Sequence, residues 1–478
     1  MPNLEKEAAD CQTEFFQLVG EFFGRATGAL PTDFATIDGF SDELRKQAST
    51  IARRSEDAFP WVDRELRRFY LEKGPSLFGL ASRLGGLKLV LGGSSRFLGS
   101  QLAAVNGSLL YADTILIPDP VAPWLETERR EEKFRHVLML QAAHALLHLK
   151  PVVDADLPHC PILVFPSWEK VLEDEDPQTK TGISQLMTDV FAGYIDPAIA
   201  SLDDIMNLIR DQPERFLQAV EKNNLLVAPG GRIGEPLADA LARYEESIET
   251  YRASEWLQHY HRLSPAGKVM NAMSERLGPQ YHLLENSEEL KAHPLICIEQ
   301  QAHYFKLVSQ VNSDRLERLG LLDRKTKATI AGLSSDRLAW LSQVPIDALI
   351  ELRKNNENET FRKCLTAAIG NLHDAAIGDT DSVAAEMCRE IDSGIAEHNR
   401  VVREISRKYA DKRRKSAGAA MVTGLGAFVP SLAPYLGAVL PLALVGKVAW
   451  DLWDESAEKK RQSRSLMGVL AIARSADP

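Results

Sequence analysis

The sequence predicts a mainly α fold, a multi-helical bundle with a small mixed α/β portion and a C-terminal long helix that leads into an apolar helical hairpin. Helical spacing of apolar residues dominates from about residue 180 to residue 415. Three short apolar runs between residues 87 and 166 are rich in β-branched residues, which is typical of buried strands. Residues 416–446 are 31 consecutive residues without a charged side chain.

The composition restricts the class of protein. The 478 residues are 45% apolar and 26% charged, which is ordinary for a globular protein and excludes a wholly disordered or collagen-like chain. The net charge of −11 argues against nucleic acid as a partner. The five cysteines show no C-x-x-C spacing, so we expect reduced thiols and a cytoplasmic location. Acidic residues precede the first apolar run, so no secretion signal is expected.

The N-terminal part is predicted to be helical, with Pro31, Gly39 and Pro60 separating its helices. The strands are expected at LKLVL (87–91), DTILIP (113–118) and PILVFP (161–166), with a crossover helix between Trp124 and Lys150. The predicted organisation is a helical segment at 1–80, a small mixed α/β portion at 81–171, a helical domain at 181–380, and the long basic helix with the apolar hairpin at 381–478.

Several helices of the central portion carry end signals. Ser201 precedes LDDIMNLIR as an N-cap, and Pro213 follows the expected helix end at Asp211. Residues 234–263 are predicted to form one long amphipathic helix, and Pro345 is expected to begin another. From Ser382 to Lys415, apolar or ring residues recur every three or four positions, which indicates a single long helix.

The charge-free run is long enough to span a bilayer once, because about 20 apolar residues are needed. Three prolines, Pro430, Pro434 and Pro441, divide it into two arms. The preceding residues 400–415 carry eight basic and two acidic side chains, and basic residues also follow at 458–464. Basic flanks on both sides favour a re-entrant hairpin whose ends both stay in the cytoplasm.

Two interpretations of this hairpin remain open. It contacts a membrane, or it is the buried central pair of a soluble helical domain. The arrangement of a basic helix followed by a charge-free hairpin resembles the hydrophobic hairpins of pore-forming bacterial toxins such as the colicins, over about 35 residues and in composition only. The residues expected to contact a membrane or partner helices are Lys412, Arg413, Arg414, Lys415, Gly424, Gly426, Gly437, Trp450 and Trp453.

The alternative interpretation is a metal-dependent hydrolase or nuclease. His144 and His148 are four residues apart on a predicted helix, so they share a face that could bind a divalent metal, and Asp113 and Asp119 flank a strand. The H-E-x-x-H pattern of zinc proteases is absent, because Ala145 stands where that pattern has glutamate. Histidines packed on a helix face are the more ordinary explanation, so no cofactor is expected and the metal is the alternative.

The functional expectation is therefore an interaction or effector protein of bacterial type. It would engage a membrane surface containing anionic lipid, or partner helices, through its C-terminal hairpin, as a membrane-perturbing toxin or defence effector does. We expect it in the cytoplasm, peripheral to or inserted at the inner face of the membrane, with oligomerisation through the C-terminal helices. A soluble helical scaffold is a third hypothesis.

Overall fold

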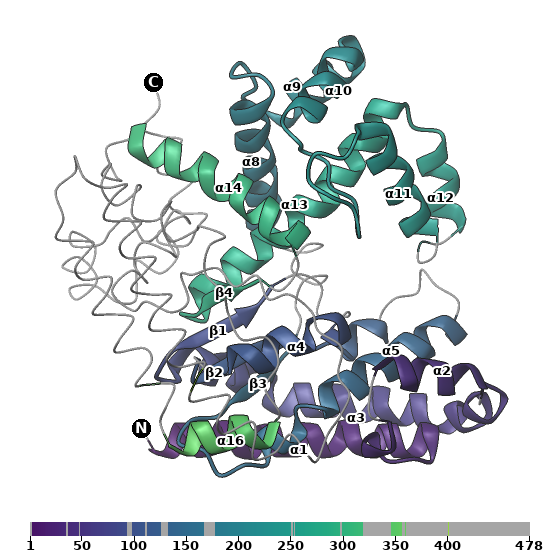
Figure 1. Ribbon diagram of the computed structural model, residues 1–478, viewed down its shortest axis with the longest axis vertical. Coiled ribbons are helices and arrows are strands. Elements are labelled where there is room, and N and C mark those ends of the chain that lie inside the picture. The colour runs from purple at the N-terminus through teal and green to yellow at the C-terminus, as the bar shows by residue number, and fades with distance from the viewer. Residues whose placement is uncertain are drawn as a thin grey trace. The chain divides into compact units, whose positions relative to one another are not determined.

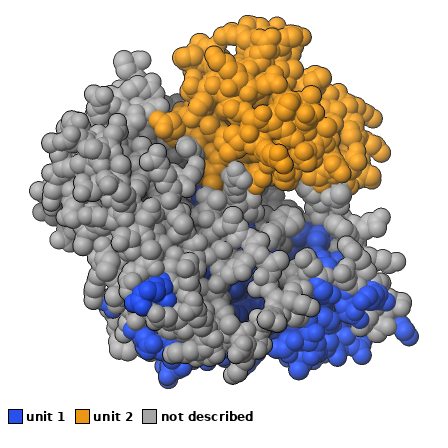
Figure 2. All heavy atoms as spheres, viewed as in Figure 1, with its two compact units in different colours: residues 1–167, 289–297, 331–433 blue, residues 168–288, 298–330, 434–478 orange. Residues whose placement is uncertain are grey.

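A computed structural model describes residues 2–34, 37–46, 48–92, 98–109, 112–125, 132–166, 177–249, 252, 254–296, 299–318, 346–355, 359 and 400. The chain divides into two compact units (Figure 2): unit 1 comprises residues 1–167, 289–297 and 331–433, and unit 2 comprises residues 168–288, 298–330 and 434–478. Helices dominate the described residues, which confirms the mainly α prediction. Apart from Arg400, the predicted long helix (382–415) and the apolar hairpin (416–446) lie outside the described residues.

Unit 1 is built on a parallel four-stranded sheet with the order β3-β2-β1-β4. Its strands are β1 (Lys88–Leu91), β2 (Thr114–Pro118), β3 (Ile162–Phe165) and β4 (His293–Leu295). The first three lie where the sequence predicts them, and every residue in them is buried. Strands buried on both faces lose the polar–apolar alternation, which is why they appear in the sequence as continuous apolar runs.

The fourth strand was not predicted. β4 has only three residues and contains Pro294, which has no backbone N–H to donate. This proline is compatible with an outer strand, because an outer strand pairs on one side only. Val90 of β1 aligns with Pro294, and the backbone N–H of Gly92 donates to the Leu295 carbonyl at 2.8 Å.

Helices of unit 1 surround this sheet (Figure 1). They are α1 (Pro2–Thr27), η1 (Pro31–Asp33), α2 (Ile37–Lys46), α3 (Ala48–Arg83), α4 (Leu98–Ser108), η3 (Ala122–Trp124), α5 (Glu132–Leu147), α6 (Lys150–Val153) and α16 (Ile346–Lys354). The crossover helix predicted between Trp124 and Lys150 is α5. Figure 1 shows α1 and α3 running alongside each other, and both also contact β3.

The expected helix break at Pro60 is wrong, because α3 continues through this residue. A proline inside a helix costs about 3 kcal/mol. Around it, however, α3 buries Phe59, Val62, Leu66 and Phe69, and each such side chain contributes about 1.5–3 kcal/mol. This burial outweighs the cost of the proline and keeps α3 continuous.

The outer edge of β3 is closed by a side chain of α1. Gln12 is fully buried, and its amide forms two hydrogen bonds with one residue of the strand. Nε2 donates to the Val164 carbonyl at 3.2 Å, and the Val164 N–H donates to Oε1 at 2.8 Å. The glutamine amide thus replaces the neighbouring strand that Val164 lacks on this side.

Unit 2 is helical in all its described elements. They are α8 (Pro177–Tyr194), α9 (Leu202–Asp211), α10 (Pro213–Lys222), α11 (Leu237–Glu249), α12 (Ser254–His261), α13 (Pro265–Glu289) and α14 (Glu299–Arg318). The predicted cap of α9 is confirmed, because the Ser201 hydroxyl accepts from the Asp204 N–H at 3.3 Å. α9 ends at Asp211, Gln212 caps both helices, and Pro213 begins α10.

The single helix predicted at 234–263 is wrong, because α11 and α12 are separate helices. Tyr244 and Tyr260 are both fully buried, with ring centroids 6.0 Å apart. Sixteen residues of one continuous helix would separate them by about 24 Å at ~1.5 Å per residue. Folding the chain back between the two helices therefore lets both rings enter one core.

We predict that Gln12→Met lowers the free energy of unfolding of unit 1 by about 2–4 kcal/mol, because it leaves a buried N–H and a buried carbonyl of Val164 without partners. Urea denaturation followed by circular dichroism measures this change. Gln17→Met on the exposed face of the same helix is the matched control and should change stability by less than about 0.5 kcal/mol. Equal effects of the two substitutions would show that the edge contact is unimportant.

Candidate functional site

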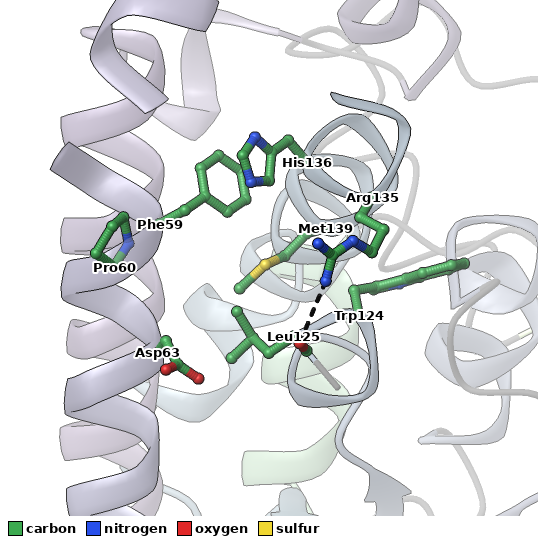
Figure 3. Close-up of a pocket in the computed structure, with 8 residues that line it drawn as sticks. All are labelled: Phe59, Pro60, Asp63, Trp124, Leu125, Arg135, His136 and Met139. Carbon is green, nitrogen blue, oxygen red and sulfur yellow. Dashed lines mark hydrogen bonds between the residues drawn. The ribbon is translucent and has the colours of Figure 1, made fainter. Parts of the chain in front are cut away.

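Unit 1 contains a cavity of about 160 Å³ beside the carboxyl end of β2. Figure 3 shows that its walls come from three elements, α3, the η3 segment that follows β2, and α5. Ligands of open parallel α/β sheets commonly bind beyond the carboxyl ends of the strands. The cavity is therefore the candidate functional site. Its lining residues are Phe59, Pro60, Asp63, Trp124, Leu125, Arg135, His136 and Met139.

Asp119 positions the η3 wall of the cavity. It follows β2 directly and is fully buried. Its Oδ1 accepts from the Val121 N–H at 2.7 Å, and its Oδ2 accepts from the Tyr70 hydroxyl at 2.6 Å. These contacts fix the turn that starts η3 and connect it to α3, so that Trp124 is held in place with 1% of its surface exposed.

The environment of Asp119 changes its acidity. Burial raises the pKa of its carboxyl to about 6, although hydrogen bonds from Tyr70 and from the backbone N–H groups of Val121 and Ala122 oppose the rise. Burial and the neighbouring Asp119 carboxylate also raise the pKa of the Tyr70 phenol well above its usual value. The Tyr70 hydroxyl and the Asp119 carboxylate are therefore a buried hydrogen-bonded pair that links η3 to α3.

Two stacked rings form a second part of the wall. His136 of α5 lies on Phe59 of α3, with ring centroids 3.5 Å apart and planes inclined by 18°. Met139 follows one turn later on α5 and is 1% exposed. The wall formed by these residues is apolar and aromatic, with the imidazole as its polar part.

Arg135 supplies the cationic group of the cavity. Its Nη1 donates to the Leu125 carbonyl at 3.4 Å, as the dashed line in Figure 3 marks. Its Nε is buried and has no acceptor among the described residues. On the α3 wall, the carboxylate of Asp63 already accepts from Arg67 Nε at 2.8 Å. Arg135 therefore places a positive charge beside the apolar and aromatic wall of the cavity.

The structure brings His144 and His148 together but surrounds His144 with apolar rings. The two imidazoles lie 4.6 Å apart at the C-terminal end of α5. His144 is fully buried and stacks on Phe40 at 4.4 Å and on Phe23 at 5.7 Å. Burial, followed by the neighbouring His148, lowers the pKa of His144 to about 4. His144 is thus a neutral core residue at physiological pH.

Asp113 and Asp119 are not brought together with each other. They stand at opposite ends of β2, so about 20 Å separates them at ~3.3 Å per residue. The Asp113 carboxylate accepts from the backbone N–H of Leu87 at 2.7 Å, and so holds the residue that directly precedes β1. Among the described residues, no group of three or more His, Cys, Asp or Glu side chains is arranged to hold a metal ion.

The structure does not describe the residues predicted to contact a membrane or partner helices, but it does describe Arg353. The membrane or partner contact residues, Lys412 to Lys415, Gly424, Gly426, Gly437, Trp450 and Trp453, lie outside the described residues. Arg353 of α16 is 3% exposed. Its guanidinium donates to the carbonyls of Leu109, Ala112 and Asp113, so it attaches α16 to the chain that enters β2.

Sequence reasoning missed Arg135, Trp124 and Phe59 as parts of one site. The sequence feature that indicates the site is Asp119, an acidic residue directly after a buried strand. Ligand sites of α/β proteins commonly lie at this end of the strands. The three residues come from different elements, and only the packing of α3 and α5 beside β2 brings them to one cavity.

We predict that His144→Leu makes the protein less sensitive to acid. Because the folded pKa of His144 is about 4 and the unfolded value is 6.5, the unfolded chain binds the proton more tightly, and stability falls as pH decreases from 6.5 to 4. The wild type should lose about 3 kcal/mol more than the variant over this interval. Urea denaturation at several pH values measures the difference, and His259→Leu at an exposed position is the control. Parallel pH profiles of wild type and His144→Leu would contradict the burial of a neutral imidazole.

Comparison of the chain with protein-family models, with curated proteins and with solved structures found no match.

Proposed function

We propose that the protein is an effector that engages an anionic membrane surface through its C-terminal apolar hairpin. The observation that carries this proposal is the run of 31 uncharged residues at 416–446, placed between two basic segments. Such a run is rare in a chain with 26% charged residues, and it exceeds the about 20 residues that one membrane helix needs.

Each part of the C-terminal segment has a role in this proposal. Lys412, Arg413, Arg414 and Lys415 attract anionic headgroups, each contributing about 1 kcal/mol near the surface. The glycines at 424, 426 and 437 allow the two arms of the hairpin to approach closely. Trp450 and Trp453 lie at the headgroup level, where the amphipathic indole ring is favoured. The proposed location is the cytoplasm, at the inner face of the membrane, and the C-terminal helices are the proposed oligomerisation element.

Within the described part of the chain, no helix combines the length and the apolar character needed to cross a membrane.

A second candidate function is small-molecule binding or enzymatic chemistry by unit 1. The observation in its favour is the cavity beside the carboxyl end of β2, with its aromatic walls and the guanidinium of Arg135. The metal-dependent hydrolase centred on His144, His148, Asp113 and Asp119 has less support, because the two carboxylates lie at opposite ends of β2 and His144 is enclosed by phenylalanine rings. Metal analysis of the purified protein tests that version.

We predict that the full-length protein floats with vesicles that contain phosphatidylserine and does not float with vesicles of phosphatidylcholine alone. Replacing Lys412, Arg413, Arg414 and Lys415 with glutamine should weaken partitioning by about 4 kcal/mol, close to a thousand-fold. Binding should also weaken as salt shortens the Debye length from about 10 Å at 0.1 M to about 3 Å at 1 M. Glutamine at Arg64, Arg67 and Arg68, which are exposed on α3, is the control and should leave flotation unchanged. Absence of flotation at low salt with anionic lipid would refute the proposal.

A charged residue introduced into the hairpin distinguishes the membrane-insertion hypothesis from the hypothesis of a buried soluble core. Gly426→Arg costs about 2.5–3.5 kcal/mol at the centre of an inserted segment, so flotation should fall while circular dichroism and solubility remain unchanged. If the hairpin is instead a dry core, an unpaired buried charge should destabilise the whole domain. Joint loss of expression and thermal stability, with no flotation in the wild type, would support the scaffold hypothesis.

A further inference from the structure

One carboxylate of α1 contacts two groups of the segment that enters β3. Glu5 lies in the first turn of α1. Its Oε2 accepts from the backbone N–H of Cys160 at 2.9 Å, and its Oε1 lies 3.0 Å from Nδ1 of His159. The side chains of His159 and Glu5 are 36% and 20% exposed, so protons from solvent can reach the contact. Glu5 and His159 are therefore an ion pair whenever the imidazole is protonated.

The segment that carries His159 is held by the sheet. The Thr114 hydroxyl donates to the Cys160 carbonyl at 2.7 Å, and the backbone N–H of Ile115 donates to the Pro161 carbonyl at 2.9 Å. Both hydrogen bonds attach the residues that follow His159 to β2. Because this segment is fixed, weakening of the ion pair should loosen the first turn of α1 rather than move the imidazole.

The charged groups around His159 come from several elements. They are Glu5 of α1, Asp113 before β2 and Arg353 of α16, and Glu5 also interacts electrostatically with Lys88 of β1. The hydrogen bond with Glu5 raises the pKa of His159 above its ordinary value of 6.5. Burial and the charge of Arg353 oppose this rise, and the charge of Asp113 supports it. The imidazole thus gains or loses its charge close to neutral pH.

The direction of the pH effect follows from the raised pKa. Because the unfolded chain has the ordinary value of 6.5, folding favours the protonated imidazole. The stabilisation by the ion pair is complete below pH 6.5, and it is lost as the pH rises through the higher folded value. The second attachment of α1 to β3, between Gln12 and Val164, contains no titratable group. Only the first turn of α1 should therefore respond.

We propose that Glu5 and His159 form a pH-sensitive ion pair that holds the first turn of α1 on the segment entering β3 when His159 is protonated and loosens it when His159 is neutral. Gln12 keeps the rest of α1 attached in both states. The ion pair lies in unit 1, so its existence does not depend on membrane contact by the C-terminal hairpin.

Hydrogen–deuterium exchange of the full chain at about pH 6 and about pH 8 tests the proposal, after correction for the intrinsic pH dependence of exchange. The backbone amides of residues 6–11 should lose about two- to five-fold in protection at the higher pH, which is the range expected for a partly exposed ion pair. The amides of residues 17–24, which lie beyond Gln12, should keep their protection. Equal protection of residues 6–11 at both pH values would overturn the proposal.

Matched variants assign the effect to the two side chains. His159→Gln removes the titration and Glu5→Gln removes the negative charge, and either change should abolish the pH dependence at residues 6–11. Glu7→Gln, at an exposed position of the same helix, is the control and should behave as the wild type does. A pH dependence that persists in folded His159→Gln would refute the role of His159 and point instead to Lys88, whose pKa burial lowers to about 8.

Histidine NMR of the full chain gives a second readout, with the His159 signal assigned by its absence from His159→Gln. The pKa of His159 should lie above 6.5 in the wild type and should fall in Glu5→Gln, because the carboxylate that favours the imidazolium is removed. The wild-type measurement does not depend on any variant. A wild-type pKa at or below 6.5 would contradict the proposal.

Discussion

A parallel sheet leaves the outer backbone groups of its edge strands unpaired, and unit 1 meets this constraint on β3 with the side-chain amide of Gln12. The two hydrogen bonds to Val164 attach α1 to the outer edge of β3 at one fixed residue. α1 in turn packs on α3, where Phe15 contacts Phe69 with ring centroids 5.5 Å apart. Together with the direct contact of α3 with β3, this edge contact helps to position α3, and hence Phe59 in the cavity wall.

The same strategy of satisfying backbone groups with buried polar side chains recurs at both ends of β2. At its amino end, the Asp113 carboxylate accepts from the Leu87 N–H, and Arg353 donates to carbonyls of the preceding chain. At its carboxyl end, Asp119 accepts from Val121 and Tyr70. The two aspartates that the sequence suggested as metal ligands are thus used to terminate a strand. Because Asp119 also fixes η3, it positions Trp124 in the wall of the cavity.

The extent to which the sequence predicts this structure depends on how local the signal is. β1, β2 and β3 were predictable because buried strands are continuous apolar runs, and the cap of α9 was predictable because a serine hydroxyl acts within three residues. Pro60 was misjudged because the burial that offsets it comes from α1. β4, the buried role of Arg353 and the cavity were beyond a single-sequence argument, since each depends on packing between segments far apart in the chain. His144 shows the same limit: its spacing from His148 suggests a metal, whereas its neighbours Phe23 and Phe40 make it a core residue.

The C-terminal hairpin is the part of the protein on which its proposed role depends, and hydrogen–deuterium exchange of residues 416–446 tests that role most directly. Exchange is measured on the full-length protein with and without vesicles containing phosphatidylserine. The proposal predicts that backbone amides of 416–446 become strongly protected when vesicles are added, while amides of β1, β2 and β3 keep their protection. Strong protection of 416–446 in the absence of lipid, unchanged by vesicles, would contradict it and would identify the hairpin as a buried core.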